Sequence, residues 1–289
     1  MLDKIIAFFM SIITFFMSLF GLNTPKLYTF ENVSYGEESR QVLDLYIPED
    51  NDGTVGLILM IHGGAWIAGD KSSYTDTAKY VAEDHGYAAA AINYRYLSDD
   101  VDMYDILDDI SAAVAKIKAL GAEKGVTIDK MILTGHSAGG HLSMLYAYSK
   151  GATSAIEPVA VIDYCGPTNL ADENFYNSDI GVDGINKLLS WSTGVDITTE
   201  TFADHKVELL AVSPIAYVST AVPTVIAHGE KDATVPYSNA TALDAALTVA
   251  GVKHDFVSYP NSGHGLSDDE DCEDKVYELF VQYSAEYLK

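Results

Sequence analysis

Apolar runs alternate with amphipathic stretches along most of this chain. Nearly continuous apolar runs span Val55 to Ile61 and Tyr87 to Asn93, which is typical of strands buried on both faces of a mainly parallel sheet. From Met103 to Leu120, apolar residues recur at three- and four-residue spacings, which predicts an amphipathic helix. We expect Gly121 and Gly125 to end that helix, because glycine readily takes the backbone conformation that closes one.

The order of these elements predicts the fold class. Leu27 to Tyr35 and Gln41 to Ile47 have strand composition and flank a polar turn, so they predict an antiparallel hairpin. Further strands are expected at Lys130 to Thr134, Pro158 to Tyr164, Pro223 to His228 and Val252 to Tyr259. Further helices are expected at Thr75 to His85, Gly140 to Tyr148, Ser238 to Ala250 and Asp271 to Leu288. This alternation predicts one α/β domain with a mostly parallel, doubly wound sheet of about eight strands.

Two segments depart from the alternation. Residues 168–213 are irregular and rich in Asp, Asn, Ser and Thr, and an insertion of that length between two strands predicts a lid. Residues 1–24 form a hydrophobic leader, whose apolar stretch Ile5 to Phe20 is intermediate in length between a signal-peptide core and a membrane-spanning helix. We expect an export signal or a retained anchor ahead of a catalytic domain at 25–289. The alternative is an amphipathic helix that covers a groove of a cytoplasmic protein.

Charge excludes some partners. Lys and Arg total 17 against 42 Asp and Glu, which gives a formal net charge of −25. Nucleic acid and anionic membranes would be repelled by the folded body, so we expect membrane contact only through residues 1–22. The two cysteines, Cys165 and Cys272, lie in unlike surroundings. We therefore expect neither a disulfide nor a metal-binding motif from them.

The most informative motif is Gly135-His136-Ser137-Ala138-Gly139. It lies between a predicted strand and a predicted helix, the context in which G-x-S-x-G forms a nucleophile elbow. Such a tight turn would give Ser137 strained backbone angles and present its hydroxyl above the edge of the sheet. The N–H of Ala138 would point to the same space at the start of the helix. Ser137 is therefore the candidate nucleophile, and a plain Gly/Ser turn is the alternative.

A serine nucleophile needs a base, and the base needs a group that orients it. His264 lies in a glycine-rich loop after the last predicted strand and is the candidate base, with His228 as its main competitor. Asp232 precedes His264 by 32 residues, which leaves room for one helix and one strand, and is the candidate acid. The rival acids are Glu230, in the same loop as Asp232, and Asp163, near the end of the strand predicted at Pro158 to Tyr164.

The reaction also needs hydrogen-bond donors for an oxyanion. His62-Gly63-Gly64-Ala65-Trp66 follows the third predicted strand and matches the HGGG-type loop, apart from the alanine in place of the last glycine. The N–H groups of Gly63, Gly64 and Ala138 form the predicted oxyanion hole, although a plain glycine turn is the alternative for the loop. We expect Trp66 to pack beneath this loop rather than to contact substrate.

Six motifs carry a resemblance to a known family. They are His62 to Trp66, Gly69-Asp70-Lys71, Asn93-Tyr94-Arg95, Gly135 to His141, Val235-Pro236 and Gly263-His264-Gly265. From about Leu27 to its end, the chain resembles α/β-hydrolase serine esterases of the hormone-sensitive-lipase-like branch. Within that branch it is most similar to bacterial carboxylesterases grouped with feruloyl-esterase-like and kynurenine-formamidase-like proteins. The resemblance implies an α/β-hydrolase fold, the triad Ser137, Asp232 and His264, and no metal or cofactor.

These observations predict a serine carboxylesterase that works through an acyl-enzyme. Members of the resembled family act on acetyl, feruloyl and short-acyl esters. We therefore expect a small or carbohydrate-linked ester with a short acyl or aryl group, including acetyl or feruloyl groups on plant polysaccharide if the protein is exported. One alternative is an amidase or formamidase that uses the same triad. Another is a membrane-attached binding protein that kept the fold without activity. A peptidase is less expected, since such relatives usually carry a further large domain. The oligomeric state is left open.

Overall fold

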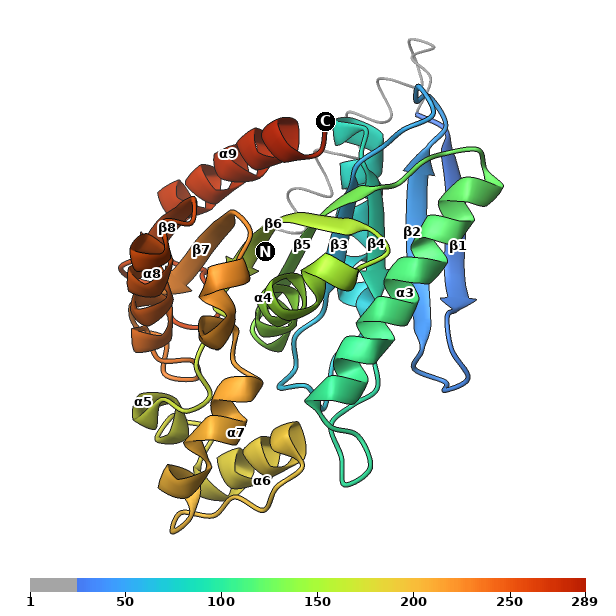
Figure 1. Ribbon diagram of the computed structural model, residues 1–289. Coiled ribbons are helices and arrows are strands. Elements are labelled where there is room, and N and C mark those ends of the chain that lie inside the picture. Colours follow the sequence, from blue (N-terminus) through green and yellow to red (C-terminus); the bar gives the residue numbers. More distant parts are fainter. Residues whose placement is uncertain (1–24) are drawn as a thin grey trace.

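An eight-stranded sheet in the order β1-β2-β4-β3-β5-β6-β7-β8 forms the centre of the computed structural model, which describes residues 25–289 (Figure 1). The strands are β1 (Leu27–Ser34), β2 (Val42–Pro48), β3 (Leu57–Ile61), β4 (Ala88–Ile92), β5 (Lys130–His136), β6 (Glu157–Tyr164), β7 (Thr224–Gly229) and β8 (His254–Tyr259). β2 is antiparallel to both β1 and β4, whereas all pairings from β4 to β8 are parallel. The predicted mostly parallel sheet with an N-terminal antiparallel hairpin is confirmed.

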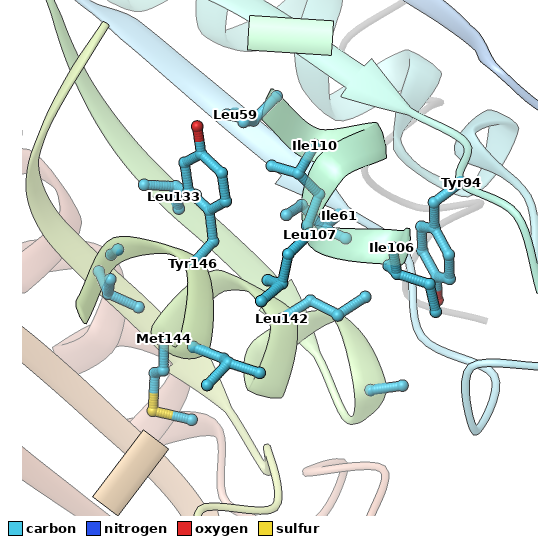
Figure 2. Close-up of a cluster of buried hydrophobic side chains, with 14 of the residues drawn as sticks. Leu59, Ile61, Tyr94, Ile106, Leu107, Ile110, Leu133, Leu142, Met144 and Tyr146 are labelled. Atoms are coloured by element: carbon cyan, nitrogen blue, oxygen red, sulfur yellow. The ribbon is translucent and has the colours of Figure 1, made fainter. Parts of the chain in front are cut away.

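Helices cover both faces of the sheet. One face carries α3 (Met103–Glu123), α4 (Ala138–Lys150) and α8 (Ser238–Ala250), and the other carries α2 (Thr75–Tyr80) and α9 (Glu270–Tyr287). Figure 2 shows the first face, where Ile110 of α3 and Leu142 of α4 lie with Leu59 and Leu133 of the sheet in one buried cluster. Because the parallel strands are covered on both sides, they read as continuous apolar runs rather than as alternating ones.

Helix α3 corrects one expectation from the sequence. It passes through Gly121 and ends two residues later, and the left-handed residue that follows it is Gly125, with φ of +74°. A Cβ on Gly121 would lie 2.9 Å from the side chain of Ile128. This glycine therefore lets the helix approach the following loop closely, and only Gly125 belongs to the end of the helix.

The segment between β6 and β7 lies at the carboxyl ends of the parallel strands (Figure 1). It contains three short helices, α5 (Glu173–Tyr176), α6 (Val182–Thr193) and α7 (Lys206–Ala211). The lid predicted at 168–213 corresponds to this segment. The predicted leader, residues 1–24, lies outside the described residues. Within 25–289, none of the helices has the length and apolar character needed to cross a membrane.

Candidate active site

Ser137 occupies a sharp turn between β5 and α4. Its φ of +59° and ψ of −123° belong to a region that residues with side chains rarely adopt. A Cβ on Gly135 would lie 2.4 Å from the carbonyl oxygen of Ile61 in β3, and a Cβ on Gly139 would lie 1.9 Å from it. The N–H of Ser137 donates to the carbonyl oxygen of Tyr164 at 2.8 Å, which holds the turn against β6. The two glycines of the motif are thus required by the neighbouring strand.

Asp232 and His264 meet at the carboxyl edge of the sheet. His264 Nδ1 lies 2.7 Å from Asp232 Oδ2, and Asp232 Oδ1 accepts the N–H groups of Thr234 (2.9 Å) and Val235 (2.8 Å). Burial by itself would raise the pKa of Asp232, but hydrogen bonds from His228 and His264 outweigh it and hold the pKa well below the usual range. The ionised carboxylate fixes the proton of His264 on Nδ1, so Nε2 is available as a base.

The rivals named from the sequence lie in other surroundings. Glu230 is exposed, and its carboxylate accepts from the Ser258 hydroxyl at 2.6 Å. Asp163 is fully buried, and one of its oxygens accepts a backbone N–H at 3.0 Å. His228 approaches Asp232 at 3.4 Å, but its side chain is inaccessible, whereas 24% of the His264 side chain is exposed. Of the two histidines, His264 is the one that a substrate could reach.

Other contacts connect this pair and the glycine loop to the elbow. His136 Nε2 lies 2.7 Å from the carbonyl oxygen of His264, and the two rings are 4.7 Å apart. A Cβ on Gly63 would lie 3.4 Å from the Cβ of Ser137. Ala138, the first residue of α4, is buried directly after the serine. In the part of the chain that the structure describes, Ser137 Oγ makes no hydrogen bond to His264; such bonds are often long before substrate binds.

The loop after β3 has an unusual backbone. Gly64, Ala65 and Trp66 have φ values of +112°, +50° and +61°. Positive φ values are uncommon for residues with side chains, so the surrounding structure must hold this loop in place. A Cβ on Gly64 would lie 2.3 Å from the carbonyl oxygen of Ala68, so glycine is required there. Trp66 is buried beneath the loop, as predicted, and its Nε1 donates to His141 Nδ1 at 3.2 Å.

Arg40, in the turn between β1 and β2, holds this loop from outside and was not singled out from the sequence. Its guanidinium donates to His62 Nε2 at 3.1 Å and to the carbonyl oxygens of Tyr94 (2.9 Å) and Gly69 (3.2 Å). Because a guanidinium only donates, Nε2 of His62 accepts and Nδ1 carries the proton, which it donates to the carbonyl oxygen of Gly63 at 2.7 Å. The available signal was composition, since Arg40 is one of only two arginines in the chain.

Residues of two further motifs support this loop and the segment that follows it. Asn93 Oδ1 accepts the N–H of Lys71 at 2.6 Å, and its Nδ2 donates to Asp70 Oδ2 at 2.7 Å. The Tyr94 hydroxyl donates to the carbonyl oxygen of His62 at 3.0 Å, and its ring stacks on the His62 ring at 4.4 Å. Burial lowers the pKa of His62, and the nearby Arg40 lowers it further, in agreement with a neutral ring.

Donor atoms that could hold a metal also gather here. Cys165, His228 and Asp232 have ligand atoms within 4.8 Å of one another, as do Cys165, His136 and His264. Nitrogen and sulfur donors suit zinc in their deprotonated forms. Burial, however, raises the pKa of the Cys165 thiol, and the aspartate and histidine atoms already bond to one another. The arrangement fits a hydrogen-bonded acid–base pair better than a resident metal. Both cysteines are free thiols.

Comparison with protein families decides the classification. Residues 43–247, more than half of the chain, match the BD-FAE family. The chain belongs to the BD-FAE family. Residues 211–286 also match the dienelactone hydrolase family. The resemblance inferred from the sequence motifs is thus confirmed.

Individual relatives are distant. The chain is 28% identical over 213 residues to probable carboxylic ester hydrolase LipM of Mycobacterium tuberculosis, which covers 72% of this chain and 49% of LipM. It is 27% identical over 299 residues to non-reducing polyketide synthase Preu6 of Preussia isomera, which covers 81% of this chain and 14% of Preu6. The chain therefore spans half or less of the length of these curated relatives.

Among solved structures, the truncated form of a carbohydrate esterase from gut microbiota has a TM-score of 0.74 with this chain. The sequence identity is 22%, and the match covers 91% of this chain and 98% of the other. Together with the sheet order, this likeness shows that the fold is the α/β-hydrolase fold.

Proposed function

We propose that this member of the BD-FAE family is a serine carboxylesterase, with Ser137 as nucleophile, His264 as base and Asp232 as the residue that orients the base. The observation that carries the proposal is the 2.7 Å hydrogen bond between His264 and Asp232 at the sheet edge where Ser137 occupies a strained turn. A buried, ionised aspartate behind an accessible imidazole is the arrangement that activates a serine hydroxyl.

In the first step, Ser137 Oγ attacks the ester carbonyl carbon while His264 Nε2 takes the hydroxyl proton. The carbonyl π electrons move to the oxygen and form a tetrahedral oxyanion. Asp232, which keeps its charge, stabilises the imidazolium that results. The low pKa of Asp232 supports this role, because the carboxylate remains ionised throughout.

The proposed oxyanion donors are the N–H groups of Gly63, Gly64 and Ala138. As the tetrahedral species collapses, the bond to the alcohol oxygen breaks, and His264 returns its proton to that oxygen. Water then repeats the sequence on the acyl-enzyme and releases the acid. Preorganised donors of this kind are commonly worth a factor of about 100 to 1,000 each in kcat.

The proposed substrates are esters with short acyl or aryl groups, among them acetyl or feruloyl groups on plant polysaccharide. The structural likeness to a carbohydrate esterase of gut microbiota supports this class. The polar composition of residues 168–213 favours short acyl groups over long lipid chains, which would need a continuous apolar surface. We also propose that residues 1–24 direct export or attach the protein to a membrane.

Hydrolysis of p-nitrophenyl acetate, butyrate and decanoate by the purified protein tests the proposal. The rate should fall with acyl length, and Ser137→Ala should lower kcat by about 1,000-fold or more while the fold is kept. Ser149→Ala, in the same helix, is the matched control and should retain full activity. A folded wild-type protein that hydrolyses none of these esters and reacts with no fluorophosphonate would refute the enzyme proposal. Faster turnover of N-formylkynurenine than of esters would instead identify a formamidase.

A further inference from the structure

A second histidine lies behind Asp232. His228, near the end of β7, is fully buried, and its Nε2 lies 2.8 Å from the carbonyl oxygen of Val235 and 3.4 Å from Asp232 Oδ2. A carbonyl oxygen only accepts, so Nε2 of His228 carries a proton. The same N–H faces the carboxylate. Asp232 Oδ2 therefore lies between the N–H groups of two histidines, one buried and one accessible.

On the opposite side of the His228 ring, the second nitrogen lacks a hydrogen-bond partner among the described residues. Within residues 25–289, His228 Nδ1 is buried without a hydrogen-bond partner, and so is Oδ2 of Asp163. Asp163 lies near the end of β6 and pairs in register with Ile226, two residues before His228 on the adjacent strand. Alternate residues of a strand face the same side, so Asp163 and His228 point to one face of the sheet. Unpaired buried polar atoms are costly, so two of them on neighbouring strands call for a common explanation.

We propose that one proton is held between Oδ2 of Asp163 and Nδ1 of His228 through a bridging water, and that the two residues together position the carboxylate of Asp232. The protonated Asp163 donates to the water, the water donates to the lone pair of Nδ1, and this fixes the ring with its Nε2–H toward Asp232. No proton leaves the pair during turnover. Neither residue touches substrate, so both are positioning residues. The effect on kcat rests on the proposed function, whereas the pairing of Asp163 with His228 does not.

The surroundings of Asp163 favour this assignment. The titratable groups that interact electrostatically with Asp163 are Tyr148 from α4, His228 from β7, and Tyr164 and Cys165, the two residues that follow it in the chain. The Tyr148 hydroxyl is already paired with the side chain of Thr224. Burial raises the pKa of Asp163 to about 7, while His228 opposes the rise. Ionisation of Asp163 would place a second buried carboxylate on the far side of His228 from Asp232, which like-charge repulsion disfavours.

Replacements at Asp163 separate a shared proton from simple packing. Asparagine can donate from its amide to the bridging water, as the protonated acid does, whereas leucine cannot. We expect Asp163→Asn to match the wild-type urea midpoint and kcat at pH 6, and Asp163→Leu to lower both. With a pKa of about 7, Asp163 loses its proton between pH 6 and pH 9, whereas asparagine keeps its donor. The ratio of the two kcat values, Asp163→Asn over wild type, should therefore rise more than twofold from pH 6 to pH 9. A ratio that stays constant over this range, or a loss at pH 6 as large as that of Asp163→Leu, would overturn the shared proton.

Replacements at His228 test the link to Asp232. His228→Leu removes the N–H and should lower kcat for p-nitrophenyl acetate about tenfold with KM unchanged, as is typical when a support of a reacting group is lost. His228→Gln retains one donor and one acceptor and should restore most of that loss. If a folded His228→Leu protein has the same kcat as wild type, His228 does not position Asp232.

A readout without turnover keeps the two proposals apart. The ¹⁵N resonances of His228, assigned by their loss in His228→Gln, should show a neutral ring with the proton on Nε2 at pH 6 in the wild-type protein. Protons on both nitrogens at that pH would contradict the pair even in an active enzyme. Failure of the esterase assays would leave the urea midpoints and ring resonances as tests of the pair alone.

Discussion

His141 should make the protein lose stability in mild acid. It lies one turn after Ser137 and is fully buried, with Nε2 2.8 Å from the carbonyl oxygen of Val212 and Nδ1 3.2 Å from Trp66 Nε1. The carbonyl only accepts and the indole N–H only donates, so the ring is neutral with its proton on Nε2. A second proton would lie on Nδ1 and face the indole N–H of Trp66, which cannot accept a hydrogen bond.

The structure gives the size of this effect. Burial lowers the pKa of His141 from 6.5 to about 4, although the hydrogen bond to Val212 opposes the shift. The unfolded chain binds the proton first as the pH falls, so the contribution to stability is present above pH 6.5 and is lost down to about pH 4. A difference of between two and three pKa units corresponds to roughly 3 kcal/mol in total. About 2 kcal/mol of this is lost between pH 7 and pH 5.

Urea denaturation of the wild-type protein and of His141→Gln at both pH values measures the effect. Glutamine can accept from Trp66 and donate to Val212 but does not titrate in this range. The free energy of unfolding of His141→Gln should therefore fall by about 2 kcal/mol less than that of wild type between pH 7 and pH 5. Other titrating groups are common to both proteins and cancel in the comparison. Equal losses in the two proteins would show that His141 accepts a proton in the folded state without cost.

Three further substitutions test how the site is supported. Gly139→Ala places a Cβ 1.9 Å from a carbonyl oxygen of β3 and should lower the free energy of unfolding in urea by more than about 3 kcal/mol. Gly151→Ala is the control: its Cβ meets nothing closer than 3.7 Å, and it should lower that free energy by less than about 1 kcal/mol. Arg40→Met removes three hydrogen bonds around the glycine loop, and kcat for p-nitrophenyl acetate should fall about tenfold with little change in KM; an unchanged kcat would show that the loop holds its shape without the guanidinium. Lys71→Met leaves the buried Asp44 without its 2.7 Å partner and should lower the free energy of unfolding in urea by about 3 kcal/mol. Lys79→Met breaks an exposed 3.2 Å ion pair and should lower it by less than about 1 kcal/mol. Equal losses would contradict the role of burial.

The fold could be predicted from local pattern because its strands are buried on both faces. Every residue of β3 and β4 is buried, so the apolar runs mark these strands to within two residues at either end. Where helix α3 begins is also a local matter, since Asp102 and Asp105 form a capping box. Where it ends depends on the approach of Gly121 to Ile128, a tertiary contact that no local pattern reveals. The one wrong helix end therefore has a physical reason.

The candidate site divides along the same line. The glycine loop and the elbow both follow predicted strands of a mostly parallel sheet, which places them at the same edge. That their strands are neighbours, with Ile61 opposite Gly135, is seen only in the structure. Arg40 reaches His62 from a hairpin turn on the far edge of the sheet, and only folding brings the two together. The roles of Asn93 and Tyr94 were equally hidden, because each binds a backbone group that is distant in sequence: the N–H of Lys71 and the carbonyl oxygen of His62.

His228 and His264, the two candidates for the base in the sequence, both lie beside Asp232 in the structure. Both direct a ring nitrogen at Oδ2 of Asp232, but one side chain is sealed from solvent and the other is 24% exposed. Accessibility therefore favours His264 for the proposed proton exchange, while the buried ring and two backbone N–H groups contact the carboxylate. A carboxylate with four N–H groups around it resists both protonation and rotation. Under this proposal, the orientation of His264 depends on His228, the residue that the sequence offered as its rival.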